Sequence, residues 1–518
     1  MSYLKKILNA RVYDVAQVTP IHVAKRLSAR LANTVLLKRE DLQPVFSFKL
    51  RGAYNKMFRL SAETRERGVI AASAGNHAQG VALAADKLKI PAYIVMPETT
   101  PAIKTRAVRD RGAEIILHGD SFDEACAHAV LLARQKELCF IHPYDDPDVS
   151  AGQGTIGLDI LQQHPLPDVV FVPVGGGGLL AGIATCLKEL RPEIRVIGVE
   201  SEESACLTAA LQAGRRVTLP QVGLFVDGVA VARVGAETFR LARRYADGVI
   251  TVSNDQVCAA TRDLFEDTRS IAEPAGALAL AGLKHYVDTH QLCDSRLMAI
   301  VSGANVDFHG LRHISERAEL GEKREAILAA TIPERPGSFY EFCLALDRRT
   351  ITEFNYRYAH PQLARIYVGV RLGADDRSEH LSGQLNRRGY PSLDLSDNEM
   401  AKQHLRFMVG GHSPQLQYEL LFRFQFAQRP GALARFLERL AGRWNISLFH
   451  YRNHSAAAGY VLAGLVVPPT ERGDCHKFLN DLNYPYTEET QNPAYQLFLG
   501  QATGRELSSL AACQGNRN

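Results

Sequence analysis

Short apolar runs that read as buried strands alternate with helical segments between about residues 20 and 320, and this alternation limits the fold more than any other feature. One example is the Val-rich run 169–174, which passes through four glycines into an expected helix. Continuous Val/Ile runs separated by helices are typical of a parallel sheet covered on both faces. We therefore expect an α/β fold with open, doubly wound parallel sheets, with strands at 68–73, 91–97, 113–117, 169–174 and 194–199 and helices at 77–87, 104–111, 121–136 and 179–190.

Length, charge and cysteine content set broad limits on the class of protein. A chain of 518 residues is too long for one ordinary core, so two to four domains are expected. Lys and Arg number 60 and Asp and Glu number 56, and there is no dense basic run, so no nucleic-acid partner is expected. The nine cysteines include no C-x-x-C pair, which favours reduced thiols over disulfides or a zinc site.

One uncharged stretch, 169–187, approaches the length of a membrane span. It contains Pro173 and four consecutive glycines, which suit a strand, a tight loop and a helix much better, so no membrane segment is expected. Residues 1–10 are too short and too mixed in character for a signal peptide. These features favour a cytoplasmic protein.

An internal repeat begins after about residue 322. Residues 332–339 align with 426–433, and residues 351–357 align with 446–452, so the two copies lie 94 to 95 positions apart. A period of this length indicates duplicated domains rather than a solenoid. Each copy runs strand, Arg-Pro-Gly turn, helix, strand and then further β and α segments, which predicts two ferredoxin-like α+β domains.

Four short motifs in the first 305 residues carry the groups of chemical interest. They are Ser47-Phe48-Lys49-Leu50-Arg51-Gly52-Ala53, Ser73-Ala74-Gly75-Asn76-His77, Gly175-Gly176-Gly177-Gly178-Leu179-Leu180 and Ser302-Gly303-Ala304-Asn305. The second and third motifs follow expected strands directly, which is where ligands bind in parallel α/β sheets. One lysine, one amide, one phosphate cradle and one hydroxyl are the groups that a protein needs to hold pyridoxal phosphate.

Each of these groups has a defined role in such a site. Lys49 forms a Schiff base with the cofactor aldehyde if burial beside Phe48 lowers its pKa. Asn76 bonds the ring hydroxyl, Ser302 meets the pyridine nitrogen, and the glycine loop offers free N–H groups to the phosphate. The predicted cofactor-binding residues are Lys49, Phe48, Asn76, Gly175, Gly176, Gly177, Gly178, Leu179 and Ser302, and the predicted catalytic residues are Lys49 and Ser73.

Taken alone, each motif also has a purely structural interpretation. Lys49 reads as a surface lysine at a helix start, and the glycines read as a plain turn. His77 reads as an N-terminal helix residue rather than a catalytic base. The glycine tract is not G-x-G-x-x-G, which argues against a dinucleotide, and no metal-ligand spacing occurs, so no metal is expected. Glu273 opens an expected helix that runs to His285, and we do not place it in the site.

With these motifs, the chain resembles the biosynthetic threonine dehydratases, also called threonine deaminases, which are fold-type II pyridoxal phosphate enzymes. The C-terminal duplicate is similar to the paired ACT-like regulatory domains of the long, isoleucine-controlled form. The resemblance implies a homotetramer that converts L-threonine to 2-oxobutanoate and ammonia, the first step of isoleucine biosynthesis. Lys49 is then the natural base for the α-proton, and Ser73 with neighbouring N–H groups would hold the substrate carboxylate.

The same resemblance implies that the N-terminal part of the chain is catalytic and the C-terminal part is regulatory. Isoleucine is the expected inhibitor and valine a candidate activator, both bound in the C-terminal part. Phe339, Tyr356 and Tyr451 are the expected effector-contacting residues, and the competing interpretation makes them core aromatics. The expected domains are a catalytic domain at 1–322 with a small subdomain inserted at about 41–148, ACT-like domains at 323–397 and 418–500, and a tail at 501–518.

Two alternatives stay open from the sequence. A related fold-type II enzyme, such as a serine dehydratase, a serine racemase or a threonine synthase, needs the same four motifs and is separated only by the C-terminal duplicate. A non-catalytic amino-acid sensor keeps the fold, although an intact Lys49 argues against it.

The hydroxyl of Ser302 does not keep the pyridine nitrogen charged, so we expect prompt β-elimination rather than racemisation or transamination.

Overall fold

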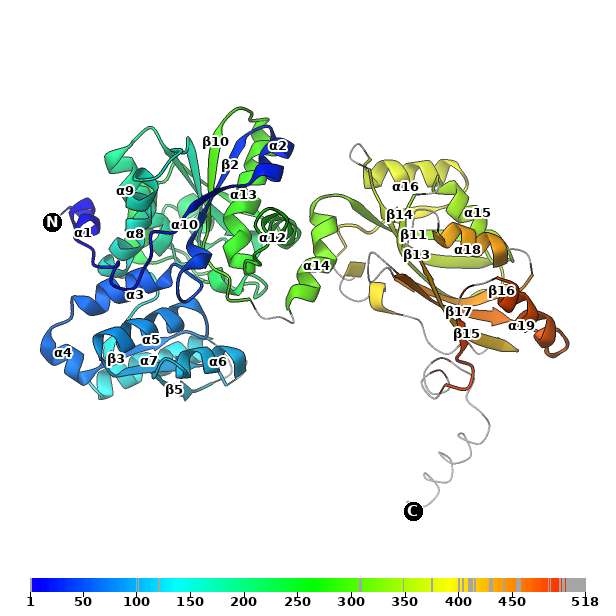
Figure 1. Ribbon diagram of the computed structural model, residues 1–518, viewed down its shortest axis with the longest axis horizontal. Helices are drawn as coiled ribbons and strands as arrows, with labels where there is room; N and C mark the ends of the chain where they lie inside the picture. Colours follow the sequence, from blue (N-terminus) through cyan, green and yellow to red (C-terminus); the bar gives the residue numbers. More distant parts are fainter. Residues whose placement is uncertain are drawn as a thin grey trace, which may run out of the picture. The chain divides into compact units, whose positions relative to one another are not determined.

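The computed structural model divides the chain into two compact units, residues 1–321 and residues 322–518 (Figure 1). The residues described are 2–499, except for 99, 101, 120–121, 307–309, 348, 374–375, 399–400, 403–404, 409–412, 414–415, 428–431, 441–442, 453–457, 483, 485, 493–494 and 496–498. The expected tail at 501–518 and the second Arg-Pro-Gly turn, at 429–431, therefore lie outside the described residues.

A six-stranded sheet forms the centre of the first unit. Its order is β1-β2-β10-β7-β8-β9, and all neighbours are parallel except β1, which pairs antiparallel with β2. Because successive side chains of a strand point to opposite faces, Val35 and Leu37 pack in one core and Leu36 packs in the other. The strands are β1 (Ile21–Val23), β2 (Thr34–Arg39), β7 (Val169–Pro173), β8 (Arg195–Ser201), β9 (Gly248–Val252) and β10 (Arg296–Val301).

Helices cover both faces of this sheet (Figure 1). Helices α2, α12 and α13 contribute to the apolar core on one face, and α8 to α11 contribute to the core on the other. Both faces are thus withdrawn from water, as the uninterrupted Val/Ile runs require. The bounds are α1 (Tyr3–Leu8), α2 (Lys25–Leu31), α8 (Pro147–Leu161), α9 (Gly178–Leu190), α10 (Cys206–Ala213), α11 (Ala236–Tyr245), α12 (Asn254–Thr268), α13 (Pro274–His290) and α14 (Gly310–Gly321).

A second, four-stranded sheet is built from the chain between β2 and α8. Its order is β5-β4-β3-β6, and every pair is parallel. Helices α3, α5 and α6 pack on one face, and α7 packs on the other. The elements are α3 (Lys49–Phe58), α4 (Ala62–Arg67), β3 (Val69–Ala72), α5 (Asn76–Leu88), β4 (Ala92–Met96), α6 (Ala102–Arg109), β5 (Glu114–Leu117), α7 (Phe122–Gln135) and β6 (Cys139–Phe140).

The second unit contains one continuous eight-stranded antiparallel sheet, ordered β14-β11-β13-β12-β16-β17-β15-β18. Each half places its fourth, first, third and second strands side by side, which is the ferredoxin-like order predicted for each repeat. The two halves meet where β12 pairs antiparallel with β16, with Phe354 opposite Tyr451. The repeats therefore share a sheet as well as a core.

Four helices cover one face of this sheet and share a single apolar core with it (Figure 1). The helices are α15 (Ser338–Ala345), α16 (Ser378–Arg387), α18 (Ala432–Leu440) and α19 (Arg472–Asp481). The strands are β11 (Glu325–Pro333), β12 (Ile351–Arg357), β13 (Leu363–Arg371), β14 (Ser392–Asp394), β15 (Glu419–Ala427), β16 (Asn445–Arg452), β17 (Ala458–Val466) and β18 (Tyr486–Glu488).

The predicted elements of the first unit are present, with small differences at their ends. The helix expected to stop at His285 continues to His290, because Tyr286 and Val287 extend its buried face. The antiparallel β1 is a departure from the purely parallel sheets that we expected. All eight cysteines of the described part are free thiols. Within the same residues, none of the helices combines the length and the apolar character that a membrane crossing requires.

Candidate functional site

Lys49 is the first residue of α3, and its side chain is partly buried rather than fully exposed. The Nζ donates a hydrogen bond to the carbonyl oxygen of Pro143 at 3.0 Å and lies 5.3 Å from the centre of the Phe48 ring. Burial lowers the pKa of Lys49 to about 8, and the charge of Glu273 acts in the opposite direction. A substantial fraction of Lys49 is therefore the neutral, nucleophilic amine in mildly alkaline solution.

The loop between β3 and α5 brings Ser73 and Asn76 to the carboxyl end of the small sheet. The Ser73 hydroxyl accepts a hydrogen bond from the backbone N–H of Gly75 at 3.1 Å, which shapes the loop. Asn76 donates through Nδ2 to Glu273 at 2.6 Å and accepts at Oδ1 from Asn305 at 2.6 Å. One Nδ2 hydrogen of Asn76 remains for a ligand.

The loop after β10 joins the Lys49 segment through its backbone. The N–H of Phe48 donates to the carbonyl of Ser302 at 3.2 Å, and the N–H of Ala304 donates to the carbonyl of Phe46 at 2.9 Å. Ser47 and Gly303 form an isolated antiparallel bridge between these bonds. The first, second and fourth sequence motifs are thus brought together by direct hydrogen bonds.

The glycine loop follows β7 and enters α9 without a side chain between them. Gly177 has a φ of +90°, a left-handed conformation that favours glycine. A methyl group at Gly176 would overlap the Tyr144 ring, so only glycine allows this packing. The first N–H groups of α9 have no partner inside the helix, and together with the helix dipole they are suited to an anion.

Residues 142–145 connect Lys49 to the glycine loop, and the sequence analysis missed them. Pro143 accepts from Lys49, and the next side chain, Tyr144, packs on Gly176 and Gly178. Asp145 accepts from the N–H groups of Ala236 and Glu237 at 2.8 and 2.9 Å and so caps α11. The signal available in the sequence was their place directly after a parallel strand, β6.

The residues present fit pyridoxal phosphate. Two buried polar atoms near Lys49, the Ser47 hydroxyl and Nδ1 of His77, have no hydrogen-bond partner within the described part of the chain, as expected where a polar ligand belongs. Ser302 is buried and donates to the carbonyl of Ala275 at 3.1 Å, and its hydroxyl can rotate toward another acceptor. An amine, an amide, an anion cradle and a hydroxyl are all available.

His77 makes a structural contact through one of its two ring nitrogens. Its Nε2 lies 2.8 Å from the carbonyl oxygen of Ile141, and the ring is buried in α5. Burial lowers the pKa of His77 to about 3, and the nearby Lys49 adds to this effect, so the ring stays neutral. No group of three or more His, Cys, Asp or Glu side chains suited to a metal ion occurs among the residues described.

A buried network of charged side chains is centred on Arg51, close to Lys49 in the sequence. Arg51, two residues further along α3, is fully buried and bonds the carboxylates of Glu40 and Asp159. It also donates to the Thr155 hydroxyl at 3.0 Å and to the carbonyl of Gln17 at 3.0 Å. Because these partners come from the N-terminal segment, from the 3₁₀ turn Glu40–Leu42 after β2 and from α8, Arg51 ties the start of α3 to these three segments.

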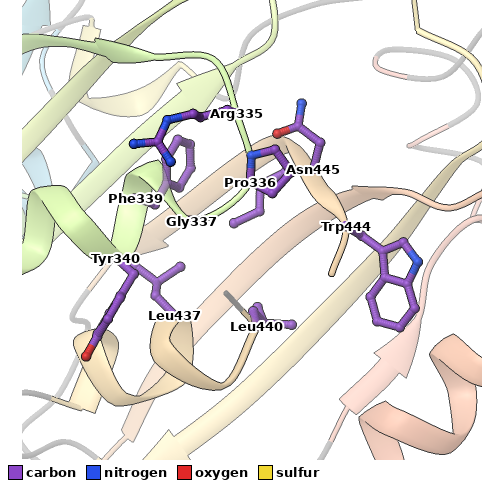
Figure 2. Close-up of a pocket in the computed structure, with 10 residues that line it drawn as sticks. Arg335, Pro336, Gly337, Phe339, Tyr340, Leu437, Leu440, Trp444 and Asn445 are labelled. Atoms are coloured by element: carbon purple, nitrogen blue, oxygen red, sulfur yellow. The ribbon is translucent and has the colours of Figure 1, made fainter. Parts of the chain in front are cut away.

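The second unit contains a pocket between the two repeats (Figure 2). The first repeat contributes its Arg-Pro-Gly turn and the start of α15, and the second contributes α18 and the start of β16. Arg335 and Asn445 lie at one end of the pocket, and Leu437 and Leu440 lie at the other (Figure 2). The lining residues are Arg335, Pro336, Gly337, Phe339, Tyr340, Leu437, Leu440, Trp444, Asn445 and Ile446.

The three predicted effector residues lie in or near this pocket to different degrees. Phe339 lines it, and its ring packs edge-on against Tyr356 with centres 5.0 Å apart. The Tyr356 hydroxyl donates to Glu334, whose other carboxylate oxygen accepts from Asn445 at 3.0 Å. Tyr451 is almost fully buried in β16 and does not line the pocket. All three also belong to the apolar core of the unit, as the competing interpretation states.

Comparisons with known proteins agree with this architecture. Residues 12–303 match the family model described as pyridoxal-phosphate dependent enzyme, and residues 316–405 and 410–499 each match the C-terminal regulatory domain of threonine dehydratase. The chain is 54% identical to the biosynthetic L-threonine dehydratase of Burkholderia multivorans over 96% of this chain and 99% of the relative. It is 55% identical to that of Escherichia coli over 96% of this chain and 97% of the relative.

Solved structures resemble a part of the chain. The processed form of threonine deaminase isoform 2 from Solanum lycopersicum has a TM-score of 0.60 and 49% identity, covering 61% of this chain and 92% of that one. Maize serine racemase has a TM-score of 0.57 and 32% identity, covering 60% and 95%. The racemase shares the catalytic fold. The two matches to the C-terminal regulatory domain of threonine dehydratase distinguish this chain from it. The chain belongs to the biosynthetic threonine dehydratases, which are pyridoxal-phosphate-dependent lyases.

Proposed function

We propose that the chain catalyses the pyridoxal-phosphate-dependent deamination of L-threonine to 2-oxobutanoate and ammonia, the first step of isoleucine biosynthesis. The observation that carries the proposal is the Lys49 amine, with its pKa lowered to about 8, held by the same segment that packs on the glycine loop. The curated relatives named L-threonine dehydratases, aligned along 96% of the chain, support threonine as the substrate.

The proposed catalytic residue is Lys49. When bound, pyridoxal phosphate withdraws electrons from the bonds of the substrate α-carbon. Nζ of Lys49 then accepts the α-proton, and the carbonyl of Pro143, 3.0 Å away, orients the amine for this step. Ser73 and the neighbouring N–H groups of its loop hold the substrate carboxylate. The Phe48 ring covers the amine and limits its contact with water.

The proposed cofactor-holding residues surround Lys49. The N–H groups of Gly175 to Gly178 and of Leu179 hold the phosphate at the start of α9. The free Nδ2 hydrogen of Asn76 bonds the ring hydroxyl, and the Ser302 hydroxyl meets the pyridine nitrogen. Because serine carries no charge, it leaves the ring a weaker electron sink than an aspartate would, which favours elimination.

The test is a keto-acid assay on the purified protein, with L-threonine and L-serine as separate substrates. We expect a yellow protein that turns over threonine faster than serine, and a Lys49→Ala variant that loses both colour and activity. Lys56→Ala is the matched control, because Lys56 lies on the same helix but pairs with Asp146 at 2.7 Å. A coloured protein that releases no keto acid from threonine would instead favour the amino-acid sensor.

We further propose that isoleucine binds the pocket between the repeats and inhibits the enzyme, and that valine competes there as an activator. An aliphatic side chain fits the apolar end formed by Phe339, Leu437 and Leu440. The Arg335 guanidinium suits a carboxylate, and Glu334, held by Tyr356 and Asn445, suits an ammonium group. The effector must prefer one of two arrangements of the protein in order to change its activity.

Calorimetric titration with isoleucine tests this assignment. Leu437→Ala removes apolar contact with the ligand and should weaken isoleucine binding by about tenfold. Leu479→Ala is the matched control, since Leu479 is a fully buried leucine of the same repeat that does not line the pocket. Equal affinity for isoleucine in the two variants would place the effector elsewhere.

The remaining expectations also stand as proposals. We propose a homotetramer in the cytoplasm, with functional boundaries at 1–322, with the small subdomain at about 41–148, and at 323–397 and 418–500. The division of the chain after residue 321 and the two regulatory matches support these boundaries. Light scattering of the purified protein across a range of concentrations measures the assembly directly.

A further inference from the structure

Glu273 is a buried carboxylate that the sequence analysis left outside the site. It immediately precedes α13, and its side chain is only 4% exposed. Its backbone N–H donates to the carbonyl of Gly303 at 3.2 Å, and its Oε1 accepts from Nδ2 of Asn76 at 2.6 Å. The carboxylate thus lies between two of the four motifs.

The chain makes room for this carboxylate at one position. A methyl group at Gly303 would overlap Oε1 of Glu273 and would lie 3.2 Å from Nδ2 of Asn76. Glycine at this position therefore permits the contact between Glu273 and Asn76, in addition to the backbone bridge with Ser47.

The Asn76 amide is fixed at both ends. Its NH₂ group faces the Glu273 carboxylate, which can only accept when ionised, and its oxygen accepts from Asn305. Nδ2 of Asn305 is held in turn by the carbonyl of Val45 at 2.9 Å. A flipped amide would set its oxygen against the carboxylate, so Glu273 determines which Asn76 atom is left for the cofactor.

Glu273 also acts on Lys49 through its charge. The carboxylate raises the proton affinity of Lys49 and thereby opposes the effect of burial. The charged groups that act on Glu273 itself are Asp227 on the 3₁₀ turn Asp227–Val229 and Lys104 on α6, which pair with each other at 2.8 Å. Burial raises the pKa of Glu273 to about 7, Asp227 adds to this, and Asn76 and Lys104 act in the opposite direction.

We propose that Glu273 is a positioning residue, whose ionised carboxylate fixes the orientation of the Asn76 amide. The proposal rests on the proposed function only in taking Lys49 as the reactive amine of a pyridoxal phosphate site. It does not depend on which amino acid is the substrate. Loss of the Glu273 charge lets the Lys49 amine lose its proton at lower pH. Loss of the hydrogen bond to Glu273 lets the Asn76 amide change its orientation.

Two substitutions separate the hydrogen bond to Asn76 from the charge of the carboxylate. Glu273→Gln keeps an acceptor for Asn76 and removes the charge, and Glu273→Ala removes both. Competitive labelling of the cofactor-free protein with acetic anhydride, followed by mass spectrometry of the Lys49 peptide, measures the pH midpoint of that amine. Equilibrium titration of the same protein with pyridoxal phosphate, followed by absorbance, measures cofactor affinity. Glu200→Gln is the matched control, because Glu200 is a buried carboxylate that accepts from Leu207 and Thr208 instead.

We expect the Lys49 midpoint to fall by about one pH unit in Glu273→Gln and to stay unchanged in Glu200→Gln. We expect cofactor affinity to fall about tenfold in Glu273→Ala and much less in Glu273→Gln, and Asn76→Ala to remove most of that difference. An unchanged midpoint in Glu273→Gln, or unchanged cofactor affinity in Glu273→Ala, would overturn the proposal. Neither readout uses threonine, so a failure of the proposed function would be seen separately.

Discussion

Arg51→Met removes the centre of the charge network behind Lys49, and we expect it to destabilise the first unit by about 3–5 kcal/mol. The guanidinium lies 2.8 and 2.9 Å from the two oxygens of Glu40 and 2.7 Å from Asp159, and all three side chains are 0% exposed. Methionine fills a similar volume but leaves two buried carboxylates without their main partner. Lys38 still lies 3.9 Å from Asp159, so one of the two carboxylates keeps a positive charge nearby. The loss of stability should therefore stay within this range.

The assay is urea unfolding followed by two probes that report on different units. The chain has a single tryptophan, Trp444, which is buried in the second unit, so its fluorescence follows that unit alone. The visible absorption of bound pyridoxal phosphate follows the first unit. Arg51→Met should move the absorption transition to lower urea and leave the fluorescence transition in place.

The control is Arg296→Met in the same unit. Arg296 pairs with Asp168 through two nitrogens, but the two side chains are 48% and 45% exposed. An exposed pair of this kind is screened by solvent and contributes little to stability. If Arg51→Met and Arg296→Met shift the absorption transition equally, burial does not govern the cost and the reasoning is wrong.

Three further outcomes follow from the site. The rate at which Lys49 takes up pyridoxal phosphate should rise with pH around a midpoint of about 8, because only the neutral amine attacks the aldehyde. Stopped-flow absorbance measures this rate. A midpoint near the pKa of a free lysine would contradict the argument that burial lowers the pKa of Lys49. Gly176→Ala should weaken cofactor binding at least about tenfold through overlap with the Tyr144 ring, and Tyr144→Ala in the same protein should restore part of it in an equilibrium titration. Ser302→Asp should shift products from keto acid toward racemised or transaminated amino acid, as chiral chromatography would detect; an unchanged distribution would count against the neutral-hydroxyl argument.

The parts of the fold that depend on local pattern could be predicted from the sequence. Buried Val/Ile runs gave β7 and β8, and the Gly175 loop was expected at the end of a strand because four glycines cannot continue either element. The ferredoxin-like order within each repeat followed from the succession of strands and helices. In each case the deciding residues are neighbours along the chain.

The parts that depend on distant residues could not be predicted. Asn76 and Glu273 are 197 positions apart, and Asn76 and Asn305 are 229 apart, so no local pattern joins them. The segment 142–145 lacks an unusual composition and gains its importance only by packing against Gly176. Nor does a duplicated sequence say which edge strands of the two copies will pair, since each copy offers two.

The pairing of β12 with β16 has a consequence for the evolution and the handling of this chain. Either repeat on its own would expose a long unpaired edge strand, a surface that recruits other chains into aggregates. Once duplication had joined the copies at this seam, neither could be deleted or replaced alone without uncovering the other. Either repeat expressed on its own should therefore be insoluble rather than a usable module.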